Sequence, residues 1–439
     1  MKTNYRLAWM FLASVAKYLI EGVFEVQRIK TRFFSLTALI IAAAMAVGMP
    51  MEAFAAFEFH VSDGASLSKV LQKELVPNTM TTIYLDSDID AIASATLTTA
   101  GLVTIEGNGH TINGNGLVNT ALRFSNTGAP TAFSHNEMVL RNVTFKDLNS
   151  SIQYGGGAIA MRSGKLTVEN CAFIGNSWIS TATNAQRGGG AICMENAASV
   201  LEITNSTFYG NETEVSGVIG LAGSGGAIYT AGGGSIKNST IVGNEAVNSN
   251  AGASVTFGGG IYKLSGGSSV LELSNNIVAE NTSQNGSASP VADDIYDGNT
   301  ATAGLLFDGD YNLIKTAVAT GGVAFTPVTN TKDGTVLDWS FLDTEPRDNG
   351  GSTLTIALLT DSNDAVDKIP SGAPVVDQRG FERDGLADIG AYEYGAVDSD
   401  PLTPPSSGSG GCNTGAFNIG GIVAAVMALA ATRFKRKRG

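Results

Sequence analysis

Hydrophobic and polar residues alternate with a period of two in several short segments in the middle of the chain. The segment Leu166–Asn176 reads LTVENCAFIGN, and similar segments begin at Leu201, Ser235 and Leu271, with a weaker copy at Val139. Alternation of this kind, without helical spacing, predicts short strands that bury one face. The copies indicate that one structural unit is repeated along the chain.

A glycine-rich string separates the alternating segments. It reads Gly-Gly-Gly-Ala-Ile or a close variant, and its isoleucine recurs at Ile159, Ile192, Ile228 and Ile261. A unit of about 33 residues that cannot bury a face alone must stack on its neighbours. We therefore expect an all-β solenoid over residues 101–300, a single-stranded parallel β-helix with one repeat per coil.

One asparagine recurs at the same point of each copy, directly after the alternating residues. Asparagine tolerates the left-handed backbone that sharp corners require. Amides stacked on successive coils can also hydrogen-bond along the axis. The repeat therefore predicts a structural ladder formed by Asn142, Asn170, Asn205, Asn238 and Asn275.

The repeats resemble those of the right-handed β-helix, pectin-lyase-like superfamily. The likeness is strongest to the GGAI and F-x-x-N repeats of polymorphic outer-membrane proteins and adhesins, and Phe173–Asn176 and Phe208–Asn211 carry the F-x-x-N form. The resemblance implies a right-handed β-helix on a bacterial cell surface or outer membrane. Open coil ends expose unpaired strand edges, so residues 56–100 are expected to form an N-terminal cap, with a short amphipathic helix near 67–75.

A second set of motifs follows the repeats. It contains D-N-G-G, A-L-L, D-Q-R-G with a following arginine, and D-I-G-A-x-E. Over residues 301–395 the set resembles the choice-of-anchor type Q domain, although residues 361–367 depart from the usual G-S-P-A-I-D. The resemblance implies a β-rich C-terminal capping region before an anchor. The motif residues are Asp348, Gly350, Gly351, Asp377, Arg379, Gly380, Arg383, Asp388, Gly390 and Glu393.

The charged residues of this region have two interpretations. Asp377, Arg379, Arg383 and Asp388 can form ion pairs and hydrogen bonds that lock the cap. Alternatively, Asp348 or Asp388 can contribute to a Ca²⁺ site, because oxygen clusters suit that ion. The ion-pair interpretation is favoured, and no other cofactor is expected.

The N-terminus has the features of a secretory signal peptide. A basic stretch at 30–32 precedes an apolar run at 33–51, and Ala53 and Ala55 form an A-x-A cleavage site. This layout predicts that residues 1–55 are a signal peptide with a long basic region. An uncleaved N-terminal anchor is the alternative.

The C-terminus has the features of a sorting or membrane-anchoring signal. A Pro/Ser/Gly linker at 396–411 leads to an apolar run at 416–431 and a basic end. Basic residues stay cytoplasmic, so the body would lie outside. The motif Gly410-Gly411-Cys412 with the following segment resembles the Synergistes-type C-terminal sorting domain, which implies cleavage by a membrane sorting protease. A permanent membrane anchor at 412–439 is the alternative.

The charge of the chain limits its possible binding partners, and its cysteine count limits its possible disulfide bonds. The net charge is −13, but residues 56–431 hold 16 basic and 37 acidic side chains, a balance of −21. An acidic body of this kind argues against nucleic acid as a partner. Three cysteines cannot form a disulfide framework, although one Cys171–Cys193 pair remains open.

The sequence contains no complete set of catalytic residues. Three glutamates, Glu169, Glu202 and Glu272, are expected at equivalent strand positions, and two tight acidic pairs lie at 293–294 and 308/310. A glycosidase needs two carboxylates about 5–10 Å apart, and the pectin-hydrolase motifs are incomplete. The histidines at 60, 110 and 135 show no metal-ligand spacing. We therefore assign no catalytic or metal residue, and favour an adhesive or display protein for a host or glycan ligand over a polysaccharide lyase or hydrolase.

Overall fold

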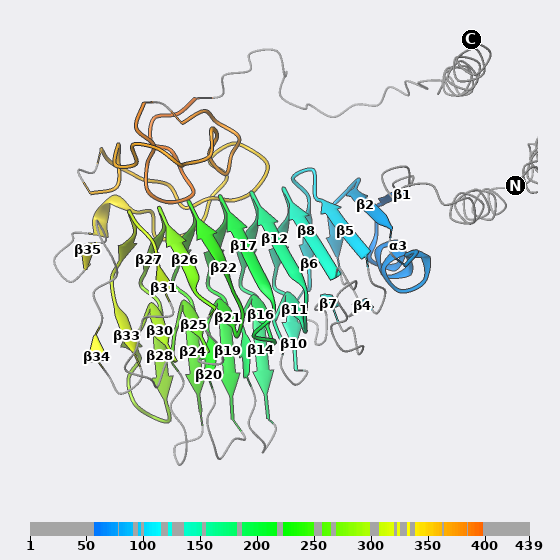
Figure 1. Cartoon of the computed structure of the whole chain (residues 1–439), viewed down its shortest axis with the longest axis horizontal. Helices are drawn as coiled ribbons and strands as arrows, with labels where there is room; N and C mark the ends of the chain where they lie inside the picture. The colour runs from blue at the N-terminus through cyan, green and yellow to red at the C-terminus, as the bar shows by residue number, and fades with distance from the viewer. Residues whose placement is uncertain are drawn as a thin grey trace, which may run out of the picture. The chain divides into compact units, whose positions relative to one another are not determined.

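The computed structural model describes residues 57–397. Within this range it leaves out 78, 91–94, 98–100, 116–121, 125–135, 152–154, 182–186, 217–222, 250–256, 265–268, 299–306, 320–322, 325–331, 334–338, 362–363 and 384. Residues 1–398 and 399–439 form separate units, and the second unit lies outside the described residues. The described fold is the parallel β-helix that the repeat predicts (Figure 1).

Sheet A forms the first face of the helix. Its nine strands pair in parallel register from coil to coil. In spatial order they are β1 (Phe57–Val61), β2 (Met80–Leu85), β5 (Gly101–Glu106), β8 (Asn136–Arg141), β12 (Lys165–Glu169), β17 (Val200–Thr204), β22 (Gly233–Lys237), β26 (Leu271–Ser274) and β31 (Phe307–Asp308).

Sheet B follows sheet A in each coil, after the corner that carries the repeated asparagine. It also has nine strands in parallel register. They are β3 (Ile89–Asp90), β6 (Thr111–Asn113), β9 (Thr144–Lys146), β13 (Ala172–Ile174), β18 (Thr207–Tyr209), β23 (Thr240–Val242), β27 (Ile277–Ala279), β32 (Leu313–Ile314) and β35 (Lys332–Asp333).

Sheet C carries the isoleucines of the glycine-rich string. Its strands are parallel except for the last, which is antiparallel. They are β4 (Ala95–Leu97), β7 (Leu122–Phe124), β11 (Ile159–Met161), β16 (Ile192–Met194), β21 (Ile228–Thr230), β25 (Ile261–Lys263), β30 (Ile295–Asp297), β33 (Ala317–Ala319) and β34 (Val323–Ala324).

Two smaller sheets lie between sheets B and C in the chain. Sheet D contains β10 (Asn149–Ser150), β14 (Ser177–Ser180), β19 (Glu212–Val215), β24 (Glu245–Asn248), β28 (Thr282–Asn285) and β29 (Val291–Ala292). The fifth sheet pairs β15 (Arg187–Gly189) with β20 (Gly223–Gly225).

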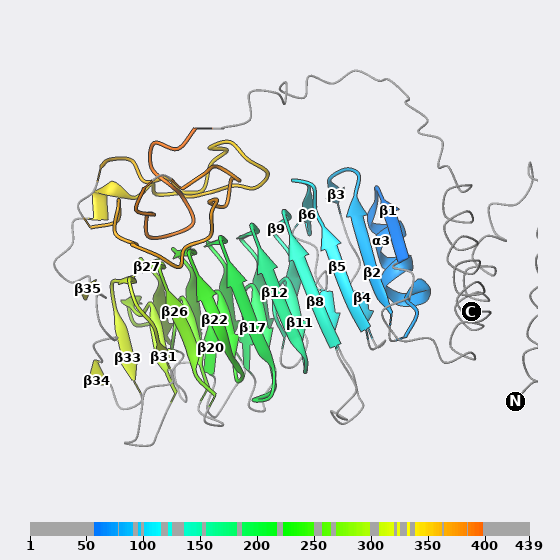
Figure 2. The same cartoon turned by 45° about the horizontal axis from the view of Figure 1, so that its top comes forward.

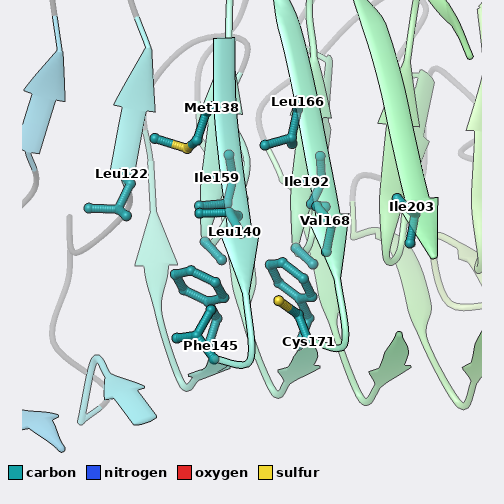
Figure 3. Close-up of a cluster of buried hydrophobic side chains, with 14 of the residues drawn as sticks. Leu122, Met138, Leu140, Phe145, Ile159, Leu166, Val168, Cys171, Ile192 and Ile203 are labelled. Atoms are coloured by element: carbon teal, nitrogen blue, oxygen red, sulfur yellow. The ribbon is translucent and has the colours of Figure 1, made fainter. Parts of the chain in front are cut away.

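Aliphatic and aromatic side chains fill the interior of the helix. Equivalent residues stack coil upon coil, so that Phe145, Phe173 and Phe208 form one column with ring centroids 5.0 and 4.7 Å apart. Figure 3 shows Phe145 beneath Leu140 and Ile159, which come from different sheets. Because every second residue of each strand points inward, the alternating sequence becomes a continuous core.

A short helix covers the N-terminal end of the core. It consists of α3 (Gly64–Lys69) and the π-helical turn η3 (Val70–Glu74), and it buries Leu67, Val70 and Leu71 against the first coils. Asp63 begins it with a capping box. The strands β1 and β2, which lie in the segment expected to form the cap, already belong to the β-helix, because they are strands of sheet A.

The C-terminal boundary differs from the sequence expectation. Strands β31, β32, β33 and β35 continue the three main sheets beyond residue 300. The helix therefore extends into the segment expected to be a cap, which sequence reasoning missed because these coils lack the glycine-rich string. After β35, residues 339–397 contain the 3₁₀ turn η5 (Trp339–Phe341) and isolated bridges. We call residues 339–397 the strap.

The strap lies along the side of the stack (Figures 1 and 2). Its apolar residues, among them Ile356, Leu358 and Ile389, form a second core with Val242 and Ile277 of sheet B. The physical reason for this position is the outer face of sheet B, which becomes apolar in the later coils and needs a cover. None of the helices among the described residues is long and apolar enough to span a membrane.

Candidate functional site

The outer face of sheet A carries a network of ion pairs. Lys165 lies 2.7 Å from Glu202, and Lys237 lies 3.1 Å from Glu272. Arg141 pairs with Glu169 on neighbouring strands. These side chains are partly exposed, and each such pair contributes at most about 1 kcal/mol. The outer face of sheet A therefore carries pairs of opposite charges that join neighbouring coils.

The three glutamates of this face do not form the single row that the sequence suggested. Glu202 and Glu272 share a row, two coils apart, with Ser235 between them. Glu169 pairs in register with Thr204, so it stands on the next row of the sheet. The copies pair in register, with Leu166 beside Leu201, and the glutamate is the fourth residue of the first copy but the second residue of the next, so it moves from one outward position to another.

The five predicted ladder asparagines all lie at left-handed corners between sheets A and B, with φ between 47° and 64°. Their amides bond along the axis at two steps. The Asn170 Nδ2 donates to Asn142 Oδ1 (3.3 Å), and the Asn275 Nδ2 donates to Asn238 Oδ1 (3.0 Å). The ladder is interrupted at Asn205, whose Nδ2 donates to the Val376 carbonyl of the strap at 2.9 Å. The structure thus brings these residues into one row and gives Asn205 a different partner.

A second, uninterrupted ladder lies at the corner between sheets B and D. Each asparagine Nδ2 donates at 2.8–2.9 Å to the side-chain oxygen of the next member, and the same oxygen accepts the backbone N–H of that asparagine. The acceptor lies on the next coil in every step but the last, where Asp294 follows Asn281 by 13 residues and directly precedes β30 of sheet C. All members are at most 1% exposed. They are Asn176, Asn211, Asn244, Asn281 and Asp294. The sequence analysis did not predict this ladder, although the asparagine of the F-x-x-N repeat recurs at its position and could have indicated it.

Asp294 ends this ladder with a carboxylate in place of an amide. Burial raises its pKa to about 7, against the effect of the hydrogen bonds from Asn281. The adjacent Asp293 is also buried, and burial raises its pKa to about 6. Asp293 accepts a hydrogen bond from the Gly258 N–H, whereas Asp294 faces Asn281. The pair therefore has a structural role at two separate contacts.

Two buried ion pairs organise the strap. Arg379 lies 2.7 Å from Asp377, and its guanidinium packs over the ring of Tyr392, 3.7 Å from the centroid. Arg383 lies 2.9 Å from Glu393. All four charged side chains are at most 3% exposed, so each charge depends on its partner.

Asp388 joins the second ion pair through its backbone, because its N–H donates to Glu393 Oε2 at 2.9 Å. The Asp388 carboxylate accepts from the backbone N–H groups of Asp367 and Tyr394, at 2.7 and 2.6 Å. Burial raises the pKa of Asp388 and raises that of Glu393 to about 7. Burial likewise lowers the pKa of Arg383.

The same residues fasten the strap to the β-helix. Arg383 donates to Asn205 Oδ1 (3.2 Å), and the Gly390 N–H donates to the Asn275 carbonyl (2.8 Å). Gln378, which the sequence showed only as part of D-Q-R-G, accepts from the Thr207 hydroxyl at 2.6 Å and is 1% exposed. The strap therefore spans the corners of several coils.

The glycines of these motifs permit close packing. Gly351 has φ of +82°, and a Cβ there would stand 2.4 Å from the Arg379 Cα. Gly350, Gly380 and Gly390 also have positive φ. Asp348 is taken up by its own turn, where it accepts from the Gly350 N–H at 3.1 Å.

The remaining candidate groups are dispersed. His60 pairs with Asp86 (2.8 Å) and His110 with Asp88 (3.2 Å). Cys171 and Cys193 are buried free thiols, so the open alternative of a disulfide between them is not realised. Among the described residues, no group of three or more His, Cys, Asp or Glu side chains is placed to hold a metal ion.

Several predicted residues lie outside the described part of the chain. The alanines of the cleavage site, Ala53 and Ala55, precede it. The sorting motif Gly410, Gly411 and Cys412 follows it. His135 falls in an internal gap. The predictions for these residues stay predictions.

Comparison with protein-family models matches residues 60–212 to a putative pectate lyase-like adhesive domain. The matched segment runs from β1 to the start of β19. No curated protein matches the chain, and no solved structure matches it. Together with the stacked parallel sheets, the family match supports an adhesin-like β-helix repeat protein. It also favours a surface or extracellular setting.

Proposed function

We propose that this chain is an exported bacterial surface protein that adheres to a host or glycan ligand. The adhesive-domain match over the first coils carries this proposal. The stacked sheets support it, since a rigid parallel stack with a core along its length is a stable display scaffold. Sheet A offers a polar, partly exposed outer face for contact.

The two ends of the sequence support the route to the surface. We infer that residues 1–55 direct export and that 412–439 sort or anchor the protein, with Cys412 as the point of processing. The segregation of charge along the chain agrees with this route, because the acidic body is flanked by basic ends. The choice-of-anchor resemblance of 301–395 would then place the strap directly before the anchor.

Mass spectrometry of the mature termini, combined with protease treatment of intact cells, tests the route. We expect an N-terminus after Ala55, strap peptides released from intact cells, and a C-terminus near Cys412 if sorting occurs. Deletion of 412–439 should release the body into the medium. An intact N-terminus together with full protease protection in intact cells would contradict the proposal.

A polysaccharide lyase or hydrolase is the alternative activity. Incubation of the purified chain with neutral and acidic polysaccharides separates the two functions. The adhesive function predicts retention of a polysaccharide with its chain length unchanged. Release of shortened or unsaturated products would overturn it.

A further inference from the structure

Glu393, near the C-terminal end of the strap, is held by hydrogen bonds on several sides. Its carboxylate accepts from Arg383 Nη1 and from the Asp388 N–H, both at 2.9 Å. Its backbone N–H donates to Asp377 Oδ2 at 3.0 Å, and its carbonyl accepts from Arg379 Nη2 at 2.7 Å. The residue is 2% exposed. Side chain and backbone of Glu393 are therefore both fixed within the strap.

The chain becomes exposed directly after this residue. Tyr394 is 40% exposed and Val397 is 76% exposed. The sequence then continues through the Pro/Ser/Gly linker to the apolar run at 416–431. Tension applied to the C-terminus therefore reaches Glu393 before it reaches any strand of the β-helix, because the whole strap lies between them in the chain.

The bonds at Glu393 continue to the β-helix. Arg383, which pairs with Glu393, also donates to Asn205 Oδ1 at 3.2 Å. Ala391 donates its N–H to Thr240 Oγ1, one coil further along, at 3.1 Å. A pull on Glu393 is thus shared among several contacts. While one of them is broken, the others hold the partners close enough for it to form again.

The strap can leave without unfolding the β-helix. The strands of the main sheets pair from coil to coil, and the described residues of the strap contribute none of these strands. Each coil is held by its neighbours. The strap covers sheet B through apolar contacts with Val242, Ile277 and Leu313. Its removal would expose this apolar face but leave the pairing of the sheets intact.

We propose that the strap is a force-bearing clasp between the β-helix and the C-terminal segment. Tension breaks the bonds at Glu393 first and then separates the strap from sheet B, while the β-helix stays folded. An extended chain spans about 3.3–3.6 Å per residue, so release of residues 339–393 lengthens the connection by up to about 190 Å. A ligand held by the β-helix stays bound while the connection extends. This role rests on the proposed attachment through the C-terminal segment, since an unattached protein carries no load.

Force spectroscopy on the purified full-length chain, kept in mild detergent, tests the proposal. One handle is joined to a cysteine that replaces Val200, which is 37% exposed on β17, and the other to a tag at the C-terminus. Cys412→Ser removes the thiol of the tail, and Cys171 and Cys193 are buried and therefore unreactive.

We expect two ruptures. The first adds up to about 190 Å, and the second, from the coils between residue 200 and the strap, adds about 450–500 Å. A single rupture that adds both lengths would overturn the proposal. Opening of the coils before the strap would overturn it as well.

Two substitutions at different contacts test which bonds carry the load. Glu393→Gln should raise the rate of the first rupture at a given force by about ten- to a hundredfold, the effect of one hydrogen bond to a charged group. Thr207→Val removes the hydroxyl that donates to Gln378 and should raise this rate by about fivefold. Thr207→Ser should restore it. The second rupture should be unchanged in all variants.

Glu382→Gln is the matched control, since Glu382 is an exposed glutamate of the strap. Its first rupture should match that of the unmodified chain. Equal acceleration in Glu382→Gln and Glu393→Gln, or an unchanged first rupture in both Glu393→Gln and Thr207→Val, would overturn the proposal. Loss of the first rupture in Glu393→Gln together with a longer starting length would support it, because the strap is then released without load.

The handles supply the load in these measurements. The outcomes therefore do not depend on export or on ligand binding, which the protease and polysaccharide experiments test separately.

Discussion

At the scale of single residues, the F-x-x-N asparagines show how a polar side chain becomes part of a core. Asn211 is fully buried, yet its Nδ2 and Oδ1 both have partners on neighbouring coils. A buried amide that satisfies its hydrogen bonds avoids a desolvation cost of about 1–3 kcal/mol. Asp294 breaks this rule, because its Oδ2 has no hydrogen-bond partner among the described residues. Above neutral pH, where the Asp294 carboxyl is ionised, this end of the ladder is therefore the member that stabilises the fold least.

Replacing Asp294 by asparagine should reduce the dependence of stability on pH. The pKa of this carboxyl is about 7 in the folded protein and 3.8 ordinarily. Between these values the folded state holds a proton that the unfolded state has released, so stability falls as pH rises through about 7. Thermal unfolding from about pH 5 to about pH 8 should show a loss smaller by about 2–4 kcal/mol in Asp294→Asn.

The exposed carboxyl of Glu58 provides the control. Glu58→Gln should give a melting curve against pH that runs parallel to that of the unmodified chain. The readout is the slope, so a uniform change in melting temperature does not affect the comparison. Parallel curves for Asp294→Asn and the unmodified chain would show that Asp294 is not buried as an acid.

At the scale of structural elements, the glycine-rich string sets how closely the coils can stack. The Gly190 N–H donates to the Gly225 carbonyl of the next coil. The isoleucine that follows in each string points into the core on sheet C. The glycines of the string leave room for a close backbone contact between coils, and the isoleucine that follows them supplies a large apolar side chain to the core. This combination explains why the two residue types recur together.

Gly190→Ala should destabilise the helix by about 3 kcal/mol. A Cβ at this position would stand 1.9 Å from the Gly226 carbonyl oxygen, so the backbone of two coils would have to separate. Urea unfolding followed by circular dichroism measures the change. A cost below about 1 kcal/mol would mean that the coils can move apart freely.

Gly210→Ala is the matched control. Gly210 has φ of +62°, but nothing lies within 4 Å of the position that a Cβ would take. Its replacement should cost only the conformational strain of about 1 kcal/mol. The difference between the two variants isolates the contribution of close backbone packing.

At the scale of the whole described body, the strap links coils that are distant in the sequence. Val376 contacts Asn205, and Gly390 contacts Asn275, two coils further along. Nearest-neighbour coils in a solenoid are coupled only to each other. A segment that crosses several corners adds a longer-range connection. The position of the strap on sheet B, rather than at the end of the stack, makes this connection.

Arg383→Gln should destabilise the strap by about 3–5 kcal/mol, because it leaves Glu393 buried without a partner. The substitution also removes the hydrogen bonds to Asn205 and to the Gly390 carbonyl. Hydrogen exchange should increase in residues 375–397 and along β18, β23 and β27. Exchange in α3 and β2, which lie far from the strap in both views, should not change (Figures 1 and 2).

Arg347→Gln is the control for this variant. Arg347 pairs with Asp343 and Glu345 at the surface of the strap, where an ion pair contributes at most about 1 kcal/mol. Its exchange pattern should match that of the unmodified chain. If both variants behave alike, the buried pair does not hold the strap in place.

The sequence alone determined the parallel β-helix, the left-handed asparagine corners and the residues that organise the strap. Alternation, the glycine-rich string and recurring asparagines are local patterns, and each coil reproduces the same local geometry. Only the tertiary structure decided which asparagine row is continuous, since Asn205 and Asn211 both recur but only Asn205 meets the strap. It also decided that Glu393, rather than Asp388, pairs with Arg383. These choices depend on which surfaces meet across long stretches of chain, and that information is not present in a local repeat.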